Sequence, residues 1–223
     1  MDVWANHALT CACGGDRTKR HNLVRNTFAR LAASAGWWPE IEKPGLLHPR
    51  PSQDGWSEDG SEGSEGGQRS SACRPGDVYI PRWDLGGTAA LNFVVTSGLR
   101  ADLLEQTAAV GLSCLTSYED HKKTFLDTAA QCASEGITFL PLVMEAHSGA
   151  WGPTATKILL KLGKNIVMVS GESTSLEALR AKQNLGLVLH RETARAVLRR
   201  SPVLAMTDDQ DSAYNLLSST GSV

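Results

Sequence analysis

The segment RPGDVYIPRWDLGGTAALNFVVTSGLR, residues 74–100, holds two runs rich in β-branched and aromatic residues, separated by Gly86-Gly87. Such runs joined by a glycine turn are typical of a β-hairpin, so we expect strands over residues 77–83 and 89–98. Asp77 opens the first strand, and Asn92 lies in the second, where a partner of Asp77 is expected. The pair is either a metal site with one member changed or two polar residues at the end of a sheet.

Helices and strands are predicted on both sides of this hairpin. Apolar residues at helical spacing indicate a first helix from about Asn22 to Gly36, and WWPEIEKPG (37–45) indicates a short strand. The later elements are a helix over about 117–135, a buried strand in ITFLPLVMEAH (137–147), a helix that starts at Pro153-Thr154, and a helix from about Leu176 to Arg200. This order predicts an α/β fold, a mixed sheet with helices on its faces.

Composition divides the chain into four expected regions. Residues 49–72 are almost pure Ser, Gly, Glu and Pro with one Trp, so they predict a disordered insertion within a core of residues 21–152. A short N-terminal segment, 1–20, precedes the core. Residues 153–202 are expected to form a helical extension, and residues 203–223 a flexible polar tail.

The bulk numbers are ordinary for a soluble globular protein, with 41% hydrophobic and 21% charged residues. The formal net charge is −2, so any binding of nucleic acid has to use local basic patches. No apolar run approaches the length of a membrane span, and the N-terminus lacks the pattern of a secretory signal. The five cysteines form no secreted disulfide pattern. We therefore expect a nuclear or cytoplasmic protein without a membrane partner.

A divalent-metal nuclease needs carboxylates that hold Mg²⁺ against a phosphate, and a lysine that orients or activates water. Asp77 and residue 92 can approach each other across a twisted hairpin, and Lys122 and Lys123 of the following helix can reach the same edge. Spacing alone leaves the structural alternative open.

Six segments of the chain carry a resemblance to a known family: HALTC…GGDRTKRHNLVRN, EKPGLL, RPGDVYIP, ALNFVVTSG, YEDHKKTFLDTAAQC and FLPLVMEAHSGAWGP. From about His7 to Gly152, in this order, they resemble the restriction-like endonuclease domain found C-terminal to reverse transcriptase in some non-LTR retrotransposon polyproteins. That family is similar to the PD-(D/E)xK nucleases, whose core has the element order predicted above. The resemblance implies metal-dependent nicking of DNA with Mg²⁺ or Mn²⁺, and a reverse transcriptase domain as partner in the parent polyprotein.

The resemblance also implies roles for individual residues. Asp77 corresponds to the metal-binding aspartate of the PD element, Asn92 falls at the second acidic ligand, and Lys122 acts on the water. Glu42, in EKPG, is an auxiliary metal ligand in this scheme. Because an amide is uncharged and hard divalent cations favour carboxylates, Asn92 predicts weakened or abolished metal binding unless Glu42 compensates.

A second candidate metal site lies at the N-terminus. His7 and Cys11 have the spacing of the latter half of a CCHC zinc knuckle, whose first two cysteines would lie before Met1. The sequence thus indicates a fragment, or a derived reading frame, that starts inside a knuckle. Cys13 and His21 can complete a Zn²⁺ site, although Cys-x-Cys is tighter than the usual spacing; free thiols are the alternative.

Basic residues follow this segment. Arg17, Lys19, Arg20 and His21 predict contact with a DNA backbone, whereas the basic stretch at His190–Arg200 is interpreted as a solvated helix face. Three functions follow: a DNA endonuclease impaired at residue 92, a catalytically inactive DNA-binding remnant, or a plain α/β interaction domain.

Two further side-chain groups receive structural interpretations. Glu145 and His147 are predicted to have a structural role at the end of the last strand. Trp37 and Trp38 are predicted to pack the first helix against the sheet.

Overall fold

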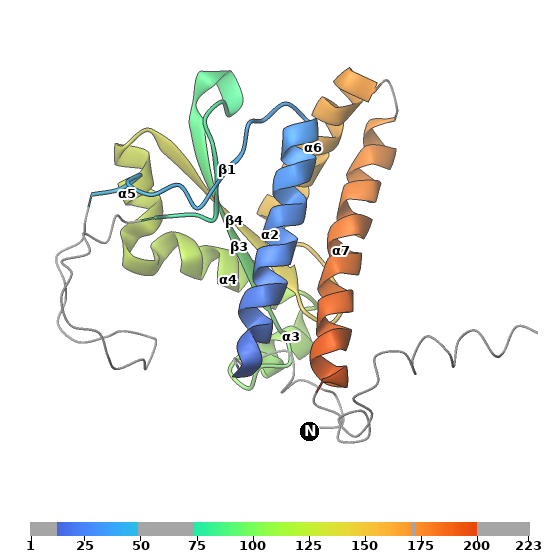
Figure 1. Cartoon of the computed structure of the whole chain (residues 1–223). Helices are drawn as coiled ribbons and strands as arrows, with labels where there is room; N and C mark the ends of the chain where they lie inside the picture. Colours follow the sequence, from blue (N-terminus) through green and yellow to red (C-terminus); the bar gives the residue numbers. More distant parts are fainter. Residues whose placement is uncertain (1–12, 49–73, 171–172, 200–223) are drawn as a thin grey trace, which may run out of the picture.

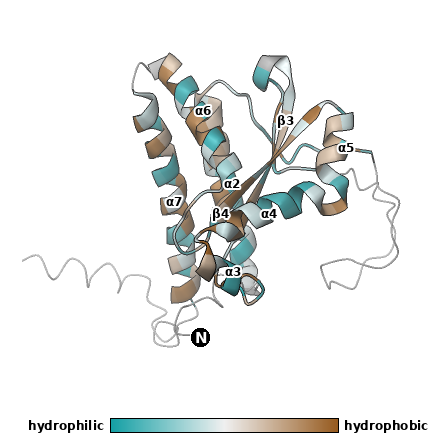
Figure 2. Cartoon of the chain, turned by 180° about the vertical axis from the view of Figure 1, so that it is seen from behind, coloured by the Kyte–Doolittle hydropathy of each residue, from teal (hydrophilic) through white to brown (hydrophobic). Residues whose placement is uncertain are grey.

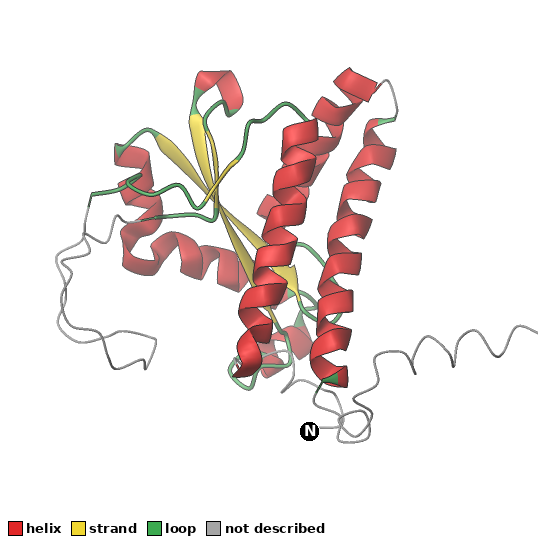
Figure 3. Cartoon of the chain, in the orientation of Figure 1, coloured by secondary structure: helices red, strands yellow, loops and turns green. Residues whose placement is uncertain are grey.

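The computed structural model describes residues 13–48, 74–170 and 173–199. The predicted insertion, the tail, His7 and Cys11 lie outside these residues. The helices and strands are, in chain order, α2 (Asp16–Ser34), β1 (Glu40–Ile41), β2 (Val78–Ile80), β3 (Thr88–Thr96), α3 (Leu104–Ala109), α4 (Ser113–Thr124), α5 (Thr128–Ser134), β4 (Ile137–Glu145), α6 (Pro153–Ser170) and α7 (Thr174–Leu198) (Figures 1 and 3).

The strands form one mixed sheet in the order β1-β2-β3-β4. β1 and β2, and β2 and β3, are antiparallel, while β3 and β4 are parallel and are connected through α3, α4 and α5. The hairpin is confirmed, with Val78 opposite Leu91. Pro141 is tolerated in β4 because this strand is at the edge of the sheet. The predicted fold class, a mixed α/β sheet flanked by helices with a helical C-terminal extension, is confirmed.

Helices cover both faces of the sheet. Figure 1 shows α2, α6 and α7 on one side and α4 and α5 on the other. The largest hydrophobic cluster joins the sheet to the first group of helices and includes Phe28 of α2, Leu159 and Leu162 of α6, and Leu185 and Leu189 of α7. The helical extension therefore belongs to the main core. Figure 2 shows β3 and β4 as mainly hydrophobic and α4 as mainly hydrophilic.

Several boundaries differ from the prediction. The first helix starts at Asp16 and not near Asn22, so it carries the whole basic stretch. The helix expected over 117–135 is two helices, because Leu126 and Asp127 between them have positive φ angles of 50° and 51°. The short helix α3 was not predicted. No helix in the described part of the chain combines the length and apolar content that a membrane span requires.

The prediction for the two adjacent tryptophans is half right. Trp37 is buried, and its ring lies 6.4 Å from that of Phe28 and 5.0 Å from that of Trp83. Trp38 is 70% exposed, so its predicted packing role is wrong. Its φ angle of 55°, directly before Pro39, turns the chain and separates the two indoles.

Candidate nucleic-acid interface

The pairing of β2 with β3 ends early, so that within the described residues the part of β3 after Leu91 has no paired strand on that side. The register stops at Val78–Leu91, and the Asp77 N–H still donates to the Leu91 carbonyl over 2.8 Å. Gly76 makes this approach possible, since a Cβ there would lie 2.8 Å from the Leu91 oxygen. The glycine before Asp77 thus brings that aspartate close to the middle of β3.

The Asp77 side chain continues the interrupted pairing. Its Oδ2 accepts hydrogen bonds from the Phe93 N–H at 2.7 Å and from Asn92 Nδ2 at 3.2 Å. The Phe93 carbonyl lies 3.1 Å from His21 Nε2, which is also 3.4 Å from Asp77 Oδ2. A carboxylate and an imidazole therefore cap the N–H and C=O of Phe93, which would otherwise be orphaned.

The electrostatics favour a charged His21. The hydrogen bond with Asp77 raises the pKa of His21 above its ordinary value, against the opposing effect of burial. Asp77 itself is buried, with 8% of its surface exposed. The buried carboxylate thus has a partner that is able to carry a positive charge, which neutralises it inside the fold.

Asn92 faces α4 and α5. Side chains alternate along a strand, and its neighbours on that face are Ala90 and Val94, which pack in the clusters of α5 and α4. The Asn92 Oδ1 atom is buried without a hydrogen-bond partner in the structure. Asn92 and Lys122 line the same two cavities. The fold therefore places Asn92 against Asp77 and on the same cavities as Lys122.

Glu42 is near Asp77 through its backbone only. The Glu42 N–H donates to the Asp77 carbonyl over 2.9 Å, while the Glu42 carboxylate forms ion pairs with Arg25 and, at 3.0 Å, with Arg74. The Glu42 carboxylate, which was expected to assist a metal, is thus paired with two guanidinium groups.

The donor set around Asp77 does not fit a hard divalent cation as the side chains stand. Asp77 Oδ2 is engaged by two donors, and Asn92 contributes an uncharged amide. Within the described residues no group of three or more His, Cys, Asp and Glu side chains could hold a metal ion. Metal binding by Asp77, Asn92 and Glu42 stays a prediction.

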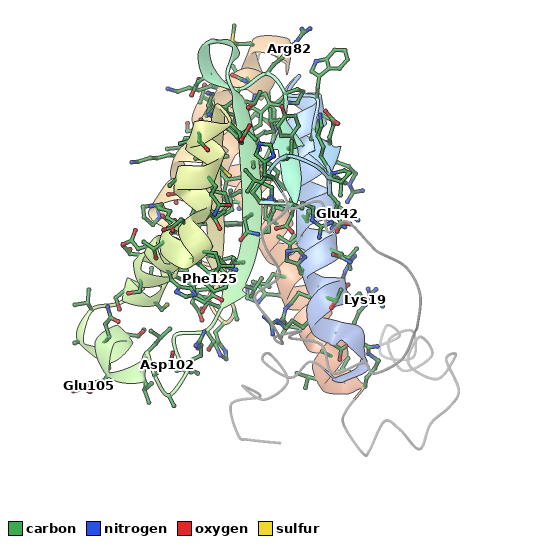
Figure 4. All side chains as sticks on the ribbon, turned by 90° about the vertical axis from the view of Figure 1, so that its left-hand side faces the viewer. Lys19, Glu42, Arg82, Asp102, Glu105 and Phe125 are labelled. Carbon is green, nitrogen blue, oxygen red and sulfur yellow. The ribbon has the colours of Figure 1, made fainter. Side chains whose placement is uncertain are left out.

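Three adjoining cavities of about 200, 390 and 420 Å³ form a groove along this part of β3, hereafter the β3 groove. The first two share Asn92 and Lys122, and the last two share Arg17, Arg20, Val95 and Tyr118. Figure 4 shows this side of the molecule, with Lys19 and Glu42 on the side of α2 and Phe125 and Asp102 on the side of α4.

The cationic residues of the β3 groove come from several elements. Arg17, Arg20 and His21 of α2 are among the lining residues, whereas Lys19 is exposed and lines none of the three cavities. Their predicted contact with a DNA backbone stays a prediction. Arg74 and Arg100 also line the groove and were missed by the sequence analysis. No periodic pattern marks either residue, because both lie in loops.

The end of β4 behaves as a structural feature, as predicted. The Glu145 carboxylate accepts hydrogen bonds from the backbone N–H groups of Gly98, His147 and Ser148 and from the Ser148 hydroxyl. Burial alone raises the pKa of Glu145, but these hydrogen bonds together hold it below its ordinary value. His147 contributes its backbone to this turn.

Comparison of the chain with protein-family models and with curated proteins found no match. Of the expected zinc ligands, only His21 has a described side chain, and it contacts Asp77.

Proposed function

We propose that this chain is a DNA-binding domain descended from the retrotransposon endonucleases that it resembles, and that DNA lies in the β3 groove. One observation carries the proposal: Arg17, Arg20 and His21 from α2, and Lys122 from α4, line a single cavity together with Asn92. Cationic side chains of two separate helices thus line the same cavity.

Phosphate contacts explain why this arrangement suits a nucleic acid. A duplex carries closely spaced negative charges, and arginine and lysine side chains that replace its counterions supply most of the non-specific affinity. Among the described residues, the lining of this cavity includes cationic side chains and no aspartate or glutamate. With a net charge of −2, the chain has no general attraction for DNA, so binding has to be local.

Metal-dependent nicking is a second candidate function. It is favoured by the closeness of Asp77 Oδ2 and Asn92 Nδ2, at 3.2 Å, and by Lys122 in the same cavity. The uncharged amide of Asn92 and the arginine partners of Glu42 are the reasons for ranking it second. A reverse transcriptase domain of a parent polyprotein, and a nuclear or cytoplasmic location, belong to the same proposal.

Binding of a labelled duplex at several salt concentrations tests the first proposal. We expect Lys122→Ala and Arg17→Ala to weaken binding and to reduce the salt slope by about 1 each. Lys164→Ala is the matched control, since Lys164 is an exposed lysine of α6 that lines none of the three cavities. Absence of salt-dependent binding by the parent chain would favour the plain interaction domain.

Nicking of supercoiled plasmid with Mg²⁺ or Mn²⁺ separates the two functions. The parent chain, Asp77→Ala and Asn92→Asp are compared at equal DNA occupancy. If the chain is an inactive DNA-binding remnant, the parent and Asp77→Ala should not cleave the plasmid, and only Asn92→Asp can show activity. Cleavage by the parent that disappears in Asp77→Ala would instead establish a working nuclease and show that an amide is tolerated at residue 92.

A further inference from the structure

The cavity of about 420 Å³ lies where the two parallel strands end. Thr96 and Ser97 at the end of β3, and Ala146 directly after β4, line it. Open α/β sheets bind ligands beyond the carboxyl ends of their parallel strands, and this volume falls in the range of small-molecule sites. Neither the Asp77 pair nor Lys122 lines this cavity, which we call the strand-end pocket.

The charge of the strand-end pocket favours an anion. Its lining includes Arg17, Arg20 and Arg100 against a single aspartate, Asp102. Asp102 accepts from Arg100 Nε at 3.0 Å and from Arg100 Nη2 at 2.8 Å, which fixes the plane of that guanidinium. Among the described residues, three arginines and one aspartate thus line the pocket.

Two buried polar side chains line the same pocket. Arg20 is only 4% exposed, so part of the positive charge is at the base of the pocket and not on the outer surface. Thr96 is also 4% exposed, and its Oγ1 is buried without a hydrogen-bond partner in the structure. An orphaned hydroxyl in the wall of an arginine-lined pocket has an unmet hydrogen bond, which an anionic oxygen in the pocket would satisfy once the Thr96 side chain turns toward it.

We propose that the strand-end pocket binds a phosphate monoester, either the terminal phosphate of a DNA strand or that of a free nucleotide. A monoester carries close to two negative charges at neutral pH and three acceptor oxygens, which match the arginines and the Thr96 hydroxyl. Arg17 and Arg20 also line the adjoining cavity of the β3 groove, so a strand lying in the groove ends at this pocket. For a DNA strand, the inference rests on the proposed function; for a free nucleotide, it does not.

The test compares short 3′-labelled or 5′-labelled single strands that carry a terminal phosphate at the unlabelled end with strands that carry a hydroxyl there. Fluorescence anisotropy with the whole chain measures both affinities. We expect the phosphorylated strand to bind about tenfold tighter, the effect of one charge-assisted bidentate contact. Calorimetric titration with inorganic phosphate and with dAMP tests the free ligands.

Matched variants test whether the preference for a terminal phosphate depends on the strand-end pocket. Arg100 and Thr96 line the strand-end pocket and neither of the other two cavities of the β3 groove, so Arg100→Ala and Thr96→Val should both abolish the preference for the phosphorylated strand. Thr96→Val keeps the shape of the side chain, so we expect this variant to fold. A thermal midpoint equal to that of the parent would verify it. Lys122 lines the other two cavities of the groove and not the strand-end pocket, so Lys122→Ala should weaken the binding of both strands equally and keep the preference. Asp102→Asn removes the one negative charge and should tighten the binding of the phosphorylated strand.

The outcomes separate the two proposals. Binding of dAMP or phosphate without any binding of hydroxyl-ended strands or of the labelled duplex supports the pocket and rejects the DNA-binding function. Equal affinity for the two strands, with no heat from dAMP or phosphate, overturns the pocket and leaves DNA binding standing. A preference that survives in both Arg100→Ala and Thr96→Val also overturns it, because the phosphate would then lie elsewhere.

Discussion

Asp77 and Glu145 are both buried carboxylates that accept a hydrogen bond from a backbone N–H in or just after β3, but their other partners differ. Glu145 receives four hydrogen bonds, three of them from the backbone and the fourth from Ser148 next to it. Asp77 receives one from the backbone, at Phe93, and is otherwise attended by the side chains of Asn92 and His21.

The difference separates a structural carboxylate from one that can exchange partners. Backbone donors cannot leave Glu145 without unfolding the turn, so its oxygens are committed. Side-chain donors can rotate away from Asp77, which also lies beside a groove lined by cations. A buried acid that is served by side chains is therefore the better candidate for chemistry, even where both acids are equally hidden from water.

The largest effect is expected from the committed carboxylate. Glu145→Ala leaves three backbone N–H groups without their acceptor and should lower the free energy of unfolding by about 3 kcal/mol. Urea denaturation measures it, with the exposed Glu105→Ala as control. Equal stability of the two variants would mean that water replaces the carboxylate and that the contrast with Asp77 is false.

At the other carboxylate, Asp77→Ala removes a single backbone acceptor and should cost about 2 kcal/mol. The loss should be local: hydrogen exchange of the Phe93 amide should accelerate in this variant. Asp120→Ala, on the surface of α4, is the control. Unchanged protection of Phe93 would show that the cap on β3 contributes nothing.

Asn92→Asp sharpens the comparison by placing two carboxylates together. Without metal, repulsion should destabilise the fold by on the order of 1 kcal/mol, and Mn²⁺ should restore the stability if the two oxygens can bind it. Thermal unfolding with and without Mn²⁺ measures both effects. The parent chain should respond little; a large metal-induced shift in the parent would contradict the assignment of Asn92 as the impaired ligand.

The smallest effect concerns His21. Because its pKa is raised in the fold, its contribution is fully present below the unfolded pKa of about 6.5 and is lost as the pH rises through the folded value. The difference in unfolding free energy between the parent and His21→Gln should therefore be larger at acid than at alkaline pH, on the order of 1 kcal/mol at most. His48→Gln, whose side chain is 90% exposed, should show no such change.

The sequence was sufficient to predict contacts that follow from local pairing. Asp77 meets Asn92 because hairpin register is fixed by the alternation of the strands. The ion pair of Glu42 with Arg74 could not be predicted, since the two residues are separated by the segment 49–73 and neither is marked by periodicity. The contact of His21 with Asp77 was missed because the first helix starts earlier than its apolar pattern indicates.

The packing of the first helix against the last has a consequence for how the chain folds during synthesis. α7 lies beside α2 (Figure 1) and contributes Leu185 and Leu189 to the cluster that also buries Phe28. During synthesis, the apolar face of α2 that packs against α7 therefore stays exposed until α7 has left the ribosome. We expect nascent chains that stop before α7 to remain unfolded and to depend on chaperones.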